Sequence, residues 1–429
     1  MKFHSTRDSK TRISLSDAIK QGLASDGGLF VPEVWPKIAD PSWAGLELPQ
    51  LARMILAPFF AGDILSKDLD LICRNAFDFP VPVVQLDETT SILELFHGPT
   101  AAFKDFGARF LANSLANLPN SSGKAPLVLV ATSGDTGGAV AAAFAQYTKT
   151  EVVILFPKGR ISKRQELQLT TWGSQVRAFA VEGTFDDCQK IVKEALISPH
   201  WRNKYDLISA NSINLGRLLP QMCYFAFAST NYARRQNVVP DLIVPSGNLG
   251  DSVAALWAKK IGFPIGRVGL AHNQNDAVAT YFATGVWSPK PSVETLANAM
   301  DVGNPSNFER LKFLYPDWQE MLRDVAAISV TDNEIRETIR YAYKTWRQVI
   351  CPHTAAALTM RELDRKTRPK SHVIITATAH PAKFETTVEP LTGQIVSVPV
   401  GLQELMGRPS QKEVIVPQLS VLESKLWHD

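Results

Sequence analysis

The sequence predicts an α/β protein with largely parallel sheets, and two observations support this prediction. From about residue 93, short runs of β-branched and aliphatic residues alternate with helical patterns, which is typical of βαβ units. Two strand-to-helix transitions pass through glycine-rich loops, at 133–138 and 246–250. In parallel sheets, such loops lie at the carboxyl ends of the strands, where ligands bind.

The composition suits a soluble globular protein, with 45% hydrophobic and 20% charged residues. The 429 residues are enough for two or three domains. A net charge of +3 is too small to indicate a nucleic-acid partner, and no apolar run has the length of a signal peptide or a membrane span. The four cysteines have no paired short spacing, so we expect free thiols, no metal site and a cytoplasmic protein.

Residues 1–90 are expected to form a mixed N-terminal region. Ser16 to Leu23 is predicted to be a short helix with Ser16 as its cap, and a tight turn at 25–28 leads into an apolar segment. Frequent prolines argue against long elements before a helix at 68–76. Pro80 and Pro82 mark the boundary of this region.

The rest of the chain is predicted to form two α/β domains, a smaller one at 91–210 and a larger one at 211–429. Strands are expected at 127–130, 152–156, 175–181, 207–209, 242–244, 267–270 and 373–377. Helices are expected after Ser133, Ser162 and Arg217 and at 185–197, 252–261, 334–348 and 354–366. The segment 289–325 has no regular pattern.

Lys104 stands in an apolar stretch, residues 94–107, just after the chain break at Gly98 and Pro99. A helical pattern begins there, so Lys104 is placed near a helix start in apolar surroundings. Burial lowers the pKa of a lysine and makes its amine a usable nucleophile, as Schiff-base chemistry requires. The alternative is a solvated lysine that pairs with Asp105.

The loops 133–138 and 246–250 are candidate anion sites, because glycines allow a close approach and a helix N-terminus offers free N–H groups. The alternative is a pair of tight turns that bind nothing. No dinucleotide fingerprint, Walker lysine loop or Gly-x-Ser-x-Gly elbow is present. Asn211, Ser212 and Arg217 either grip a phosphate or form a helix cap with a surface arginine.

Several motifs resemble the threonine synthase family, and together they cover nearly the whole chain. The stretch Glu94 to Gly107 is similar to the cofactor-lysine segment of that family. Further similar motifs lie at 5–8, 26–32, 131–137, 210–214, 244–251, 298–303 and 378–384. The resemblance implies the tryptophan-synthase-β-like fold (pyridoxal-phosphate fold type II), with two parallel-rich domains and an extra N-terminal region.

The resemblance also implies pyridoxal 5'-phosphate as the cofactor and a role for each matching residue. Lys104 would carry the cofactor as a Schiff base and move substrate protons, and Thr378 would face the ring nitrogen. The cofactor phosphate would be held by Ser246, Gly247, Asn248, Leu249 and Gly250.

The loop with Ser133, Asp135, Thr136 and Gly137 would receive the substrate carboxylate and face the cofactor 3-hydroxyl. Many relatives have asparagine where this chain has Asp135, so its carboxyl group either shares a proton or turns away. The substrate phosphate would be gripped by Asn211, Ser212, Arg217 and Lys383.

The implied reaction converts O-phosphohomoserine and water to threonine and phosphate, the last step of threonine biosynthesis, by a lyase that works as a monomer. Two alternatives remain open at this point. One is a related dehydratase or phosphate-releasing lyase that makes 2-oxobutyrate, and the other is a binding protein that has kept the fold without catalysis.

Overall fold

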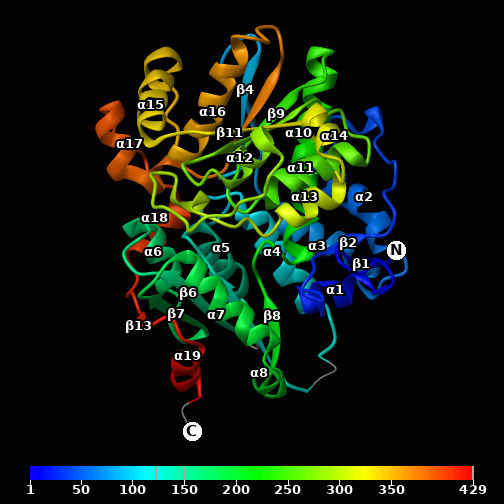
Figure 1. Ribbon diagram of the computed structural model, residues 1–429, viewed down its shortest axis with the longest axis vertical. Coiled ribbons are helices and arrows are strands. Elements are labelled where there is room, and N and C mark those ends of the chain that lie inside the picture. The colour runs from blue at the N-terminus through cyan, green and yellow to red at the C-terminus, as the bar shows by residue number, and fades with distance from the viewer. Residues whose placement is uncertain (121–122, 148–149, 428–429) are drawn as a thin grey trace.

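The computed structural model describes residues 1–120, 123–147 and 150–427. Two parallel-rich sheets, each covered by helices, lie one above the other, with the N-terminal region at their side (Figure 1). The predicted α/β class is therefore confirmed.

The six-stranded sheet has the order β11-β10-β9-β12-β4-β3, and all neighbours in it run parallel except the antiparallel pair β3 and β4. Its strands are β3 (Val83–Gln85), β4 (Thr90–Glu94), β9 (Asp241–Pro245), β10 (Val268–His272), β11 (Val325–Ser329) and β12 (Val373–Ala377). β9 and β12 are buried along their whole length, as expected for a parallel sheet with helices on both faces.

The five-stranded sheet has the order β13-β7-β6-β5-β8 and is parallel throughout. Its strands are β5 (Ala125–Ala131), β6 (Glu151–Pro157), β7 (Val176–Val181), β8 (Tyr205–Ser209) and β13 (Glu413–Ile415). The chain thus returns to this sheet near its C-terminus, after completing the other one.

Helices connect the strands, as the alternating pattern predicts. Those before strand β9 are α4 (Lys104–Ala116), α5 (Asp135–Phe144), α6 (Lys163–Thr170), α7 (Phe185–Ile197), α8 (Pro199–Lys204), α9 (Leu215–Leu218) and α10 (Gln221–Gln236). Those after it are α11 (Gly250–Lys260), α12 (Ala277–Thr284), α13 (Phe308–Leu314), α14 (Trp318–Asp324), α15 (Asp332–Trp346), α16 (Pro352–Arg365), α17 (Glu385–Thr392), α18 (Val400–Met406) and α19 (Leu419–Leu426). Capping boxes start α6, α7 and α15, where a side chain and a backbone N–H satisfy each other.

The N-terminal region packs against α4 and so supports the helix that begins at Lys104. Its elements are β1 (Phe3–Ser5), β2 (Phe30–Pro32), α1 (Leu15–Gln21), α2 (Leu48–Phe60) and α3 (Leu69–Ala76). Phe60 of α2 contacts Phe110 edge-on, with ring centroids 6.0 Å apart. Helix α1 is capped by Ser14, whereas the predicted cap Ser16 donates to the Asp63 carboxylate.

The expected segments 1–90, 91–210 and 211–429 do not coincide with the sheets. Strands β3 and β4 belong to the six-stranded sheet, although along the chain they precede β5, the first strand of the five-stranded sheet. Strand β13 belongs to the five-stranded sheet, although it follows every strand of the six-stranded sheet along the chain. Each sheet is therefore assembled from separate parts of the chain.

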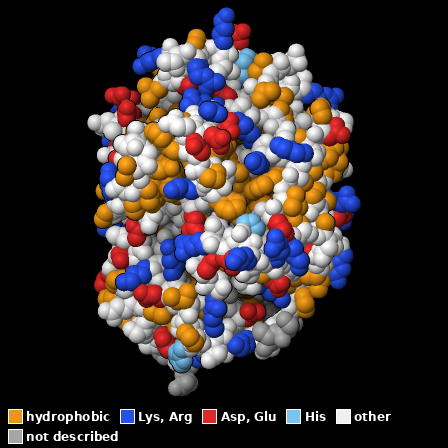
Figure 2. Space-filling model, turned by 45° about the vertical axis from the view of Figure 1, so that its right-hand side comes forward, with side chains coloured by type: hydrophobic (Ala, Val, Ile, Leu, Met, Phe, Trp, Pro, Cys, Tyr) orange, Lys and Arg blue, Asp and Glu red, His pale blue; other side chains and the backbone are white. Residues whose placement is uncertain are grey.

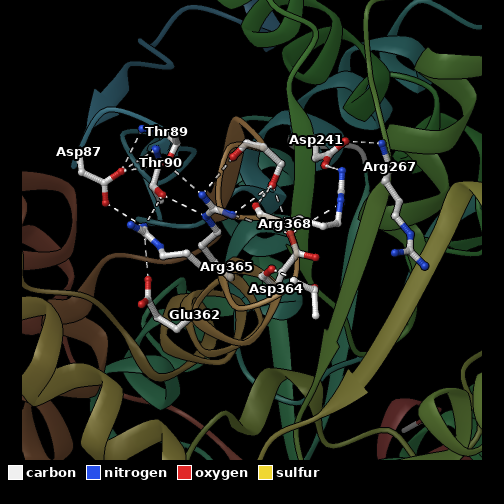
Figure 3. A network of polar contacts seen from close by, with 12 residues as sticks. Asp87, Thr89, Thr90, Asp241, Arg267, Glu362, Asp364, Arg365 and Arg368 are labelled. Carbon is white, nitrogen blue, oxygen red and sulfur yellow. Dashed lines mark hydrogen bonds and ion pairs between the residues drawn. The ribbon is translucent and has the colours of Figure 1, made fainter.

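Arg365 at the end of α16 and Arg368 just after it bind the amino ends of β4 and β9, opposite to the carboxyl ends that carry the loops (Figure 3). Arg365 pairs with Asp87, at 2.8 Å, and donates to Thr90 at the start of β4. Arg368 pairs with Asp241 at the start of β9, at 2.5 Å. These contacts hold the amino ends of two strands whose carboxyl ends carry loops.

The surface carries mixed charge. On the face shown in Figure 2, Lys and Arg side chains are interspersed with Asp and Glu, and apolar side chains gather near its middle. Within the described ranges, no helix combines the length and the apolar character that spanning a bilayer would require.

Candidate active site

Lys104 is the first residue of α4, and a tight turn places it there. Ala101 adopts φ 55°, and its N–H donates to the Gly98 carbonyl at 3.0 Å. The Asp105 carboxylate accepts from the Thr100 N–H and hydroxyl, at 2.9 and 2.6 Å. Asp105 therefore closes the turn and does not pair with Lys104, which removes the alternative considered from the sequence.

Two backbone hydrogen bonds fix this turn beside the end of β12. Ala102 and Ala379 form an antiparallel bridge, in which the Phe103 N–H donates to the Thr378 carbonyl at 2.9 Å and the His380 N–H donates to the Ala101 carbonyl at 3.0 Å. Thr378 is thereby held beside Lys104 by the backbone itself.

The carboxyl ends of five strands from both sheets lead into one pocket. The loops after β4, β9 and β12 reach it from the six-stranded sheet, and the loops after β5 and β8 reach it from the five-stranded sheet. Of the predicted site residues, it is lined by Lys104, Ser133, Asp135, Thr136, Asn211, Ser212, Arg217, Ser246, Gly247, Asn248, Leu249, Gly250 and Thr378. This position agrees with the rule that ligands bind at the carboxyl ends of parallel strands.

The loop at 246–250 has the conformation of an anion cradle at the start of α11. Leu249 takes a left-handed conformation with φ 61°, which turns the chain into the helix and leaves the first N–H groups directed at the pocket. A side chain at Gly247 would approach the Met300 Cα at 2.7 Å, so glycine is needed for this close approach. Ser246 is buried, and its hydroxyl donates to the Val244 carbonyl at 2.9 Å.

The Lys104 amine is buried and reactive in character. Burial lowers its pKa to about 8, the Asp135 carboxylate opposes this shift, and the Arg217 and Lys383 cations add to it. An amine with a pKa of about 8 is uncharged in about a tenth of the molecules at pH 7. The pKa shift predicted from the apolar sequence around Lys104 is thus present in the folded chain.

Asp135 forms a buried ion pair with Lys383. Its Oδ1 atom lies 2.6 Å from the Lys383 Nζ and also accepts from Gln165 Nε2 at 3.0 Å. Burial alone would raise the pKa of Asp135, but the Lys383 ammonium lowers it to about 2. Asp135 is therefore an ionised, neutralised carboxylate.

Gly137 and Lys383 lie differently from the sequence expectation. The Gly137 N–H donates to the Thr132 hydroxyl at 2.9 Å, and a side chain there would strike Leu169 at 2.6 Å, so this residue packs behind the pocket wall. Lys383 is fully buried, and its Nζ is occupied by Asp135 and by the Thr100 carbonyl at 3.1 Å.

Asn211, Ser212 and Arg217 all line the pocket, but their hydrogen bonds differ. Asn211 makes two hydrogen bonds to the backbone of Ala131, at 3.2 and 2.6 Å, and so ties the end of β5 to the loop after β8. The Ser212 hydroxyl accepts from Asn248 at 2.7 Å. Arg217 is buried, donates to the Ala210 carbonyl, and keeps its Nε without a protein partner.

Several pocket residues could not be singled out from the sequence. His353 of α16 accepts from the Ala299 N–H at 3.1 Å, and burial lowers its pKa to about 4, so it is neutral. Asp251 follows directly after the phosphate-type loop, and burial raises its pKa to about 7. The position of Asp251 in the first turn of α11 was the one available signal, and His353 carried none.

The pocket residues fit pyridoxal phosphate. A buried amine without an ion pair among the described residues suits an aldehyde, and the free N–H groups at the start of α11 suit a phosphate. Arg217 and Asp251 also line the pocket, and the Arg217 Nε and the Asp251 Oδ2 have no hydrogen-bond partner among the described residues.

Fold and pocket together define a pyridoxal-phosphate-dependent enzyme of fold type II. The family model "Pyridoxal-phosphate dependent enzyme" matches residues 82–379, and the models for the threonine synthase N-terminus and C-terminal region match 2–77 and 354–424. The threonine synthase of Haemophilus influenzae is 41% identical over 408 residues, which is 94% of each chain. The chain belongs to the threonine synthase family.

Solved structures agree with this assignment. The crystal structure of threonine synthase from Escherichia coli has a TM-score of 0.93 at 36% identity and covers 99% of each chain. The structure of PLP-bound threonine synthase from Brucella melitensis has a TM-score of 0.89 at 32% identity, over 99% of this chain and 98% of that one. The expected family, fold and cofactor are thereby confirmed.

Proposed function

We propose that this chain converts O-phosphohomoserine and water to threonine and phosphate, and that Lys104 is its cofactor lysine. The observation that carries the proposal is the pocket itself, where a buried amine without an ion pair, among the described residues, shares one cavity with a helix N-terminus. Membership in the threonine synthase family supports the substrate.

Pyridoxal phosphate, when bound, supplies an aldehyde that binds amines and an aromatic ring that stores electrons. In our proposal the N–H groups of 246–250 hold its phosphate, and the Thr378 hydroxyl faces its ring nitrogen. A hydroxyl does not enforce a positive charge on that nitrogen, which moderates the stored charge. Asp135, neutralised by Lys383, faces the 3-hydroxyl side without adding a net charge there.

For the substrate, we assign the carboxylate to the loop with Ser133 and Thr136 and the phosphate to Ser212 and Arg217. The free Nε of Arg217 supports the second assignment, because a buried guanidinium donor without a partner suits a phosphate oxygen. Asn211 orients this site by its two bonds to the end of β5, and Gly137 and Lys383 support the wall behind it.

Lys104 Nζ then performs the proton transfers. It takes a proton from the substrate α-carbon and then a proton from the β-carbon. The bond between the γ-carbon and the phosphate oxygen then breaks. Phosphate leaves and remains held by Ser212 and Arg217. A proton returned to the γ-carbon completes its methyl group, water adds its hydroxyl to the β-carbon, and a proton returned to the α-carbon completes threonine.

A product assay tests this function. Purified enzyme with O-phosphohomoserine is expected to release threonine and phosphate in equal amounts, whereas 2-oxobutyrate without threonine would identify a phosphate-releasing lyase instead. Lys104→Ala is expected to lose turnover by at least about a thousandfold, since both covalent attachment and proton transfer depend on its amine. Full activity of that variant would refute the assignment of Lys104.

We further propose that the enzyme acts as a monomer in the cytoplasm, without a nucleic-acid or membrane partner. The four cysteines, Cys73, Cys188, Cys223 and Cys351, are free and buried, which suits a reducing compartment. Sedimentation of the purified protein at the mass of two or more chains would contradict the monomer.

A further inference from the structure

The Asp135 carboxylate lines the pocket together with Lys104 but forms its ion pair with Lys383, which lies behind the pocket wall. Lys383 Nζ lies 2.6 Å from Asp135 Oδ1, and both side chains are buried. Gln165 Nε2 donates to the same oxygen at 3.0 Å, and Lys383 is itself anchored on the Thr100 carbonyl. Asp135 is thus held from two sides.

Lys104, in contrast, has no ion-pair partner within 4 Å among the residues that the structure describes. The charged or titratable groups that act on it are Asp135 and Asp251, which favour its ammonium form, and Arg217, Lys383 and His353, which disfavour it. Asp251 accepts the Tyr224 hydroxyl, and burial raises its pKa to about 7. Asp135 is therefore the carboxylate near Lys104 that stays ionised throughout the neutral range.

We propose that Lys383 is a positioning residue that holds the Asp135 carboxylate as its own partner and so keeps Lys104 free to react with the cofactor aldehyde. The inference rests on the proposed function in taking Lys104 as the cofactor lysine. An amine joins an aldehyde through the nitrogen lone pair, forming a carbon–nitrogen double bond and releasing one water. An ammonium group has no lone pair to use.

Without Lys383, the buried Asp135 carboxylate would lose its partner, and Lys104 is the remaining lysine that acts on it. A buried carboxylate requires a compensating charge, so Lys104 would stay protonated to a higher pH. Lys383 also repels the Lys104 ammonium directly. Both effects act in the same direction, and both disappear when Asp135 and Lys383 are neutralised together.

The test follows covalent attachment of pyridoxal phosphate to the cofactor-free protein between pH 6 and 10. Attachment is trapped by borohydride reduction and located by peptide mass spectrometry. Lys383→Met is expected to move the midpoint of the pH–rate profile upward by about one unit, which slows attachment at pH 7 about tenfold. Asp135→Asn should move the midpoint downward, and the double variant should return it close to that of the unaltered enzyme.

Lys259→Met is the matched control, because Lys259 pairs with Asp324 at the same 2.6 Å distance but outside the pocket. Its profile should coincide with that of the unaltered enzyme. A merely structural Lys383 would lower the rate equally at every pH and leave the midpoint in place, and that result would overturn the inference.

If Lys383→Met does not fold, Asp135→Asn and the double variant test the inference instead, because neither contains an unpaired buried carboxylate at position 135. An unmoved midpoint in Asp135→Asn would then refute the inference. Attachment at a lysine other than Lys104 in the unaltered enzyme would instead refute the proposed function, so the two failures are distinguishable.

Discussion

Replacing Lys104, the proposed cofactor lysine, should stabilise the protein when no cofactor is bound. The Lys104 side chain is partly exposed at the pocket, and in the cofactor-free chain the burial of its amine lowers the pKa from 10.5 to about 8. The folded state therefore holds an ammonium that it disfavours at neutral pH. Lys104→Met keeps the unbranched shape and removes the charge, so the variant should have the higher free energy of unfolding at pH 7.

The size of the expected difference in free energy of unfolding follows from the shift in the pKa of Lys104. Each unit of pKa change corresponds to about 1.4 kcal/mol, so a fall from 10.5 to about 8 costs the folded state about 3 kcal/mol wherever both states are protonated. That cost is complete below pH 8. Between pH 8 and 10.5 the unfolded chain keeps a proton that the folded chain has lost, so the stability of the unaltered enzyme rises with pH. The advantage of Lys104→Met should therefore disappear by about pH 10.5.

Urea unfolding of both cofactor-free proteins at pH 7 and pH 10 measures the difference. Cofactor must be absent, because a ligand that binds only the folded state would stabilise the unaltered enzyme. Lys259→Met serves as the control, since Lys259 pairs with Asp324 and its loss should bring no gain. A Lys104→Met variant that is less stable than the unaltered enzyme at pH 7, or an advantage that is independent of pH, would refute the reasoning.

Two further substitutions test the phosphate loop and the N-terminal support. Gly247→Ala places a methyl group 2.7 Å from the Met300 Cα, so the dissociation constant for pyridoxal phosphate should rise at least about tenfold in an equilibrium titration; Gly407→Ala, with its nearest neighbour at 4.0 Å, should leave it unchanged. Arg310→Met removes buried hydrogen bonds to the backbone carbonyls of β2 and of the loop after β8, and should lower the urea-derived free energy of unfolding by at least about 2 kcal/mol. Arg53→Met, at an exposed pair with a distance of 3.9 Å, should change that free energy by less than about 0.5 kcal/mol.

The elements with strong local signals were predictable from the sequence. The capping pairs Ser162 with Gln165 and Thr331 with Glu334 start helices where their patterns begin, and both glycine-rich loops face the pocket. Strand β13 was not predictable, because three residues carry no periodic signal and its pairing with β7 is a tertiary contact. Strand β11 begins at Val325, the last residue of the segment 289–325 that has no regular pattern, and its parallel pairing with β10 fixes its place in the sheet.

The residues of the candidate site also divide into those that the sequence could identify and those that it could not. Lys104 and the loop 246–250 are recognisable because their chemistry depends on adjacent residues. The partner of Asp135 is not recognisable, because Lys383 lies far along the chain and its motif suggested a phosphate ligand. Gly137 was also misplaced. Its motif puts it in the loop 133–138, but its close packing against Leu169 puts it behind the pocket wall.

The placement of the two sheets explains why the Asp135–Lys383 pair matters beyond its charge. The residues proposed to hold the cofactor, at Lys104, Thr378 and 246–250, follow β4, β12 and β9, which are neighbours in the six-stranded sheet. The Ala102–Ala379 bridge joins the segments after β4 and β12. Those proposed to hold the substrate follow β5 and β8 of the five-stranded sheet. A shift between the sheets would move the substrate groups while the cofactor groups keep their geometry.

Asp135 is the exception, since it starts α5 beside the five-stranded sheet yet is proposed to face the cofactor. Its bond to Lys383, which follows β12, holds it to the cofactor side, and Gln165 of α6 joins it there while also accepting from Asn298 at 2.9 Å. The ion pair therefore crosses from one sheet to the other inside the pocket wall. Removing both charges together should restore the reactivity of Lys104, but it does not restore the ion pair between the two sheets. The double variant should therefore attach the cofactor at a rate close to that of the unaltered enzyme and still bind the substrate more weakly.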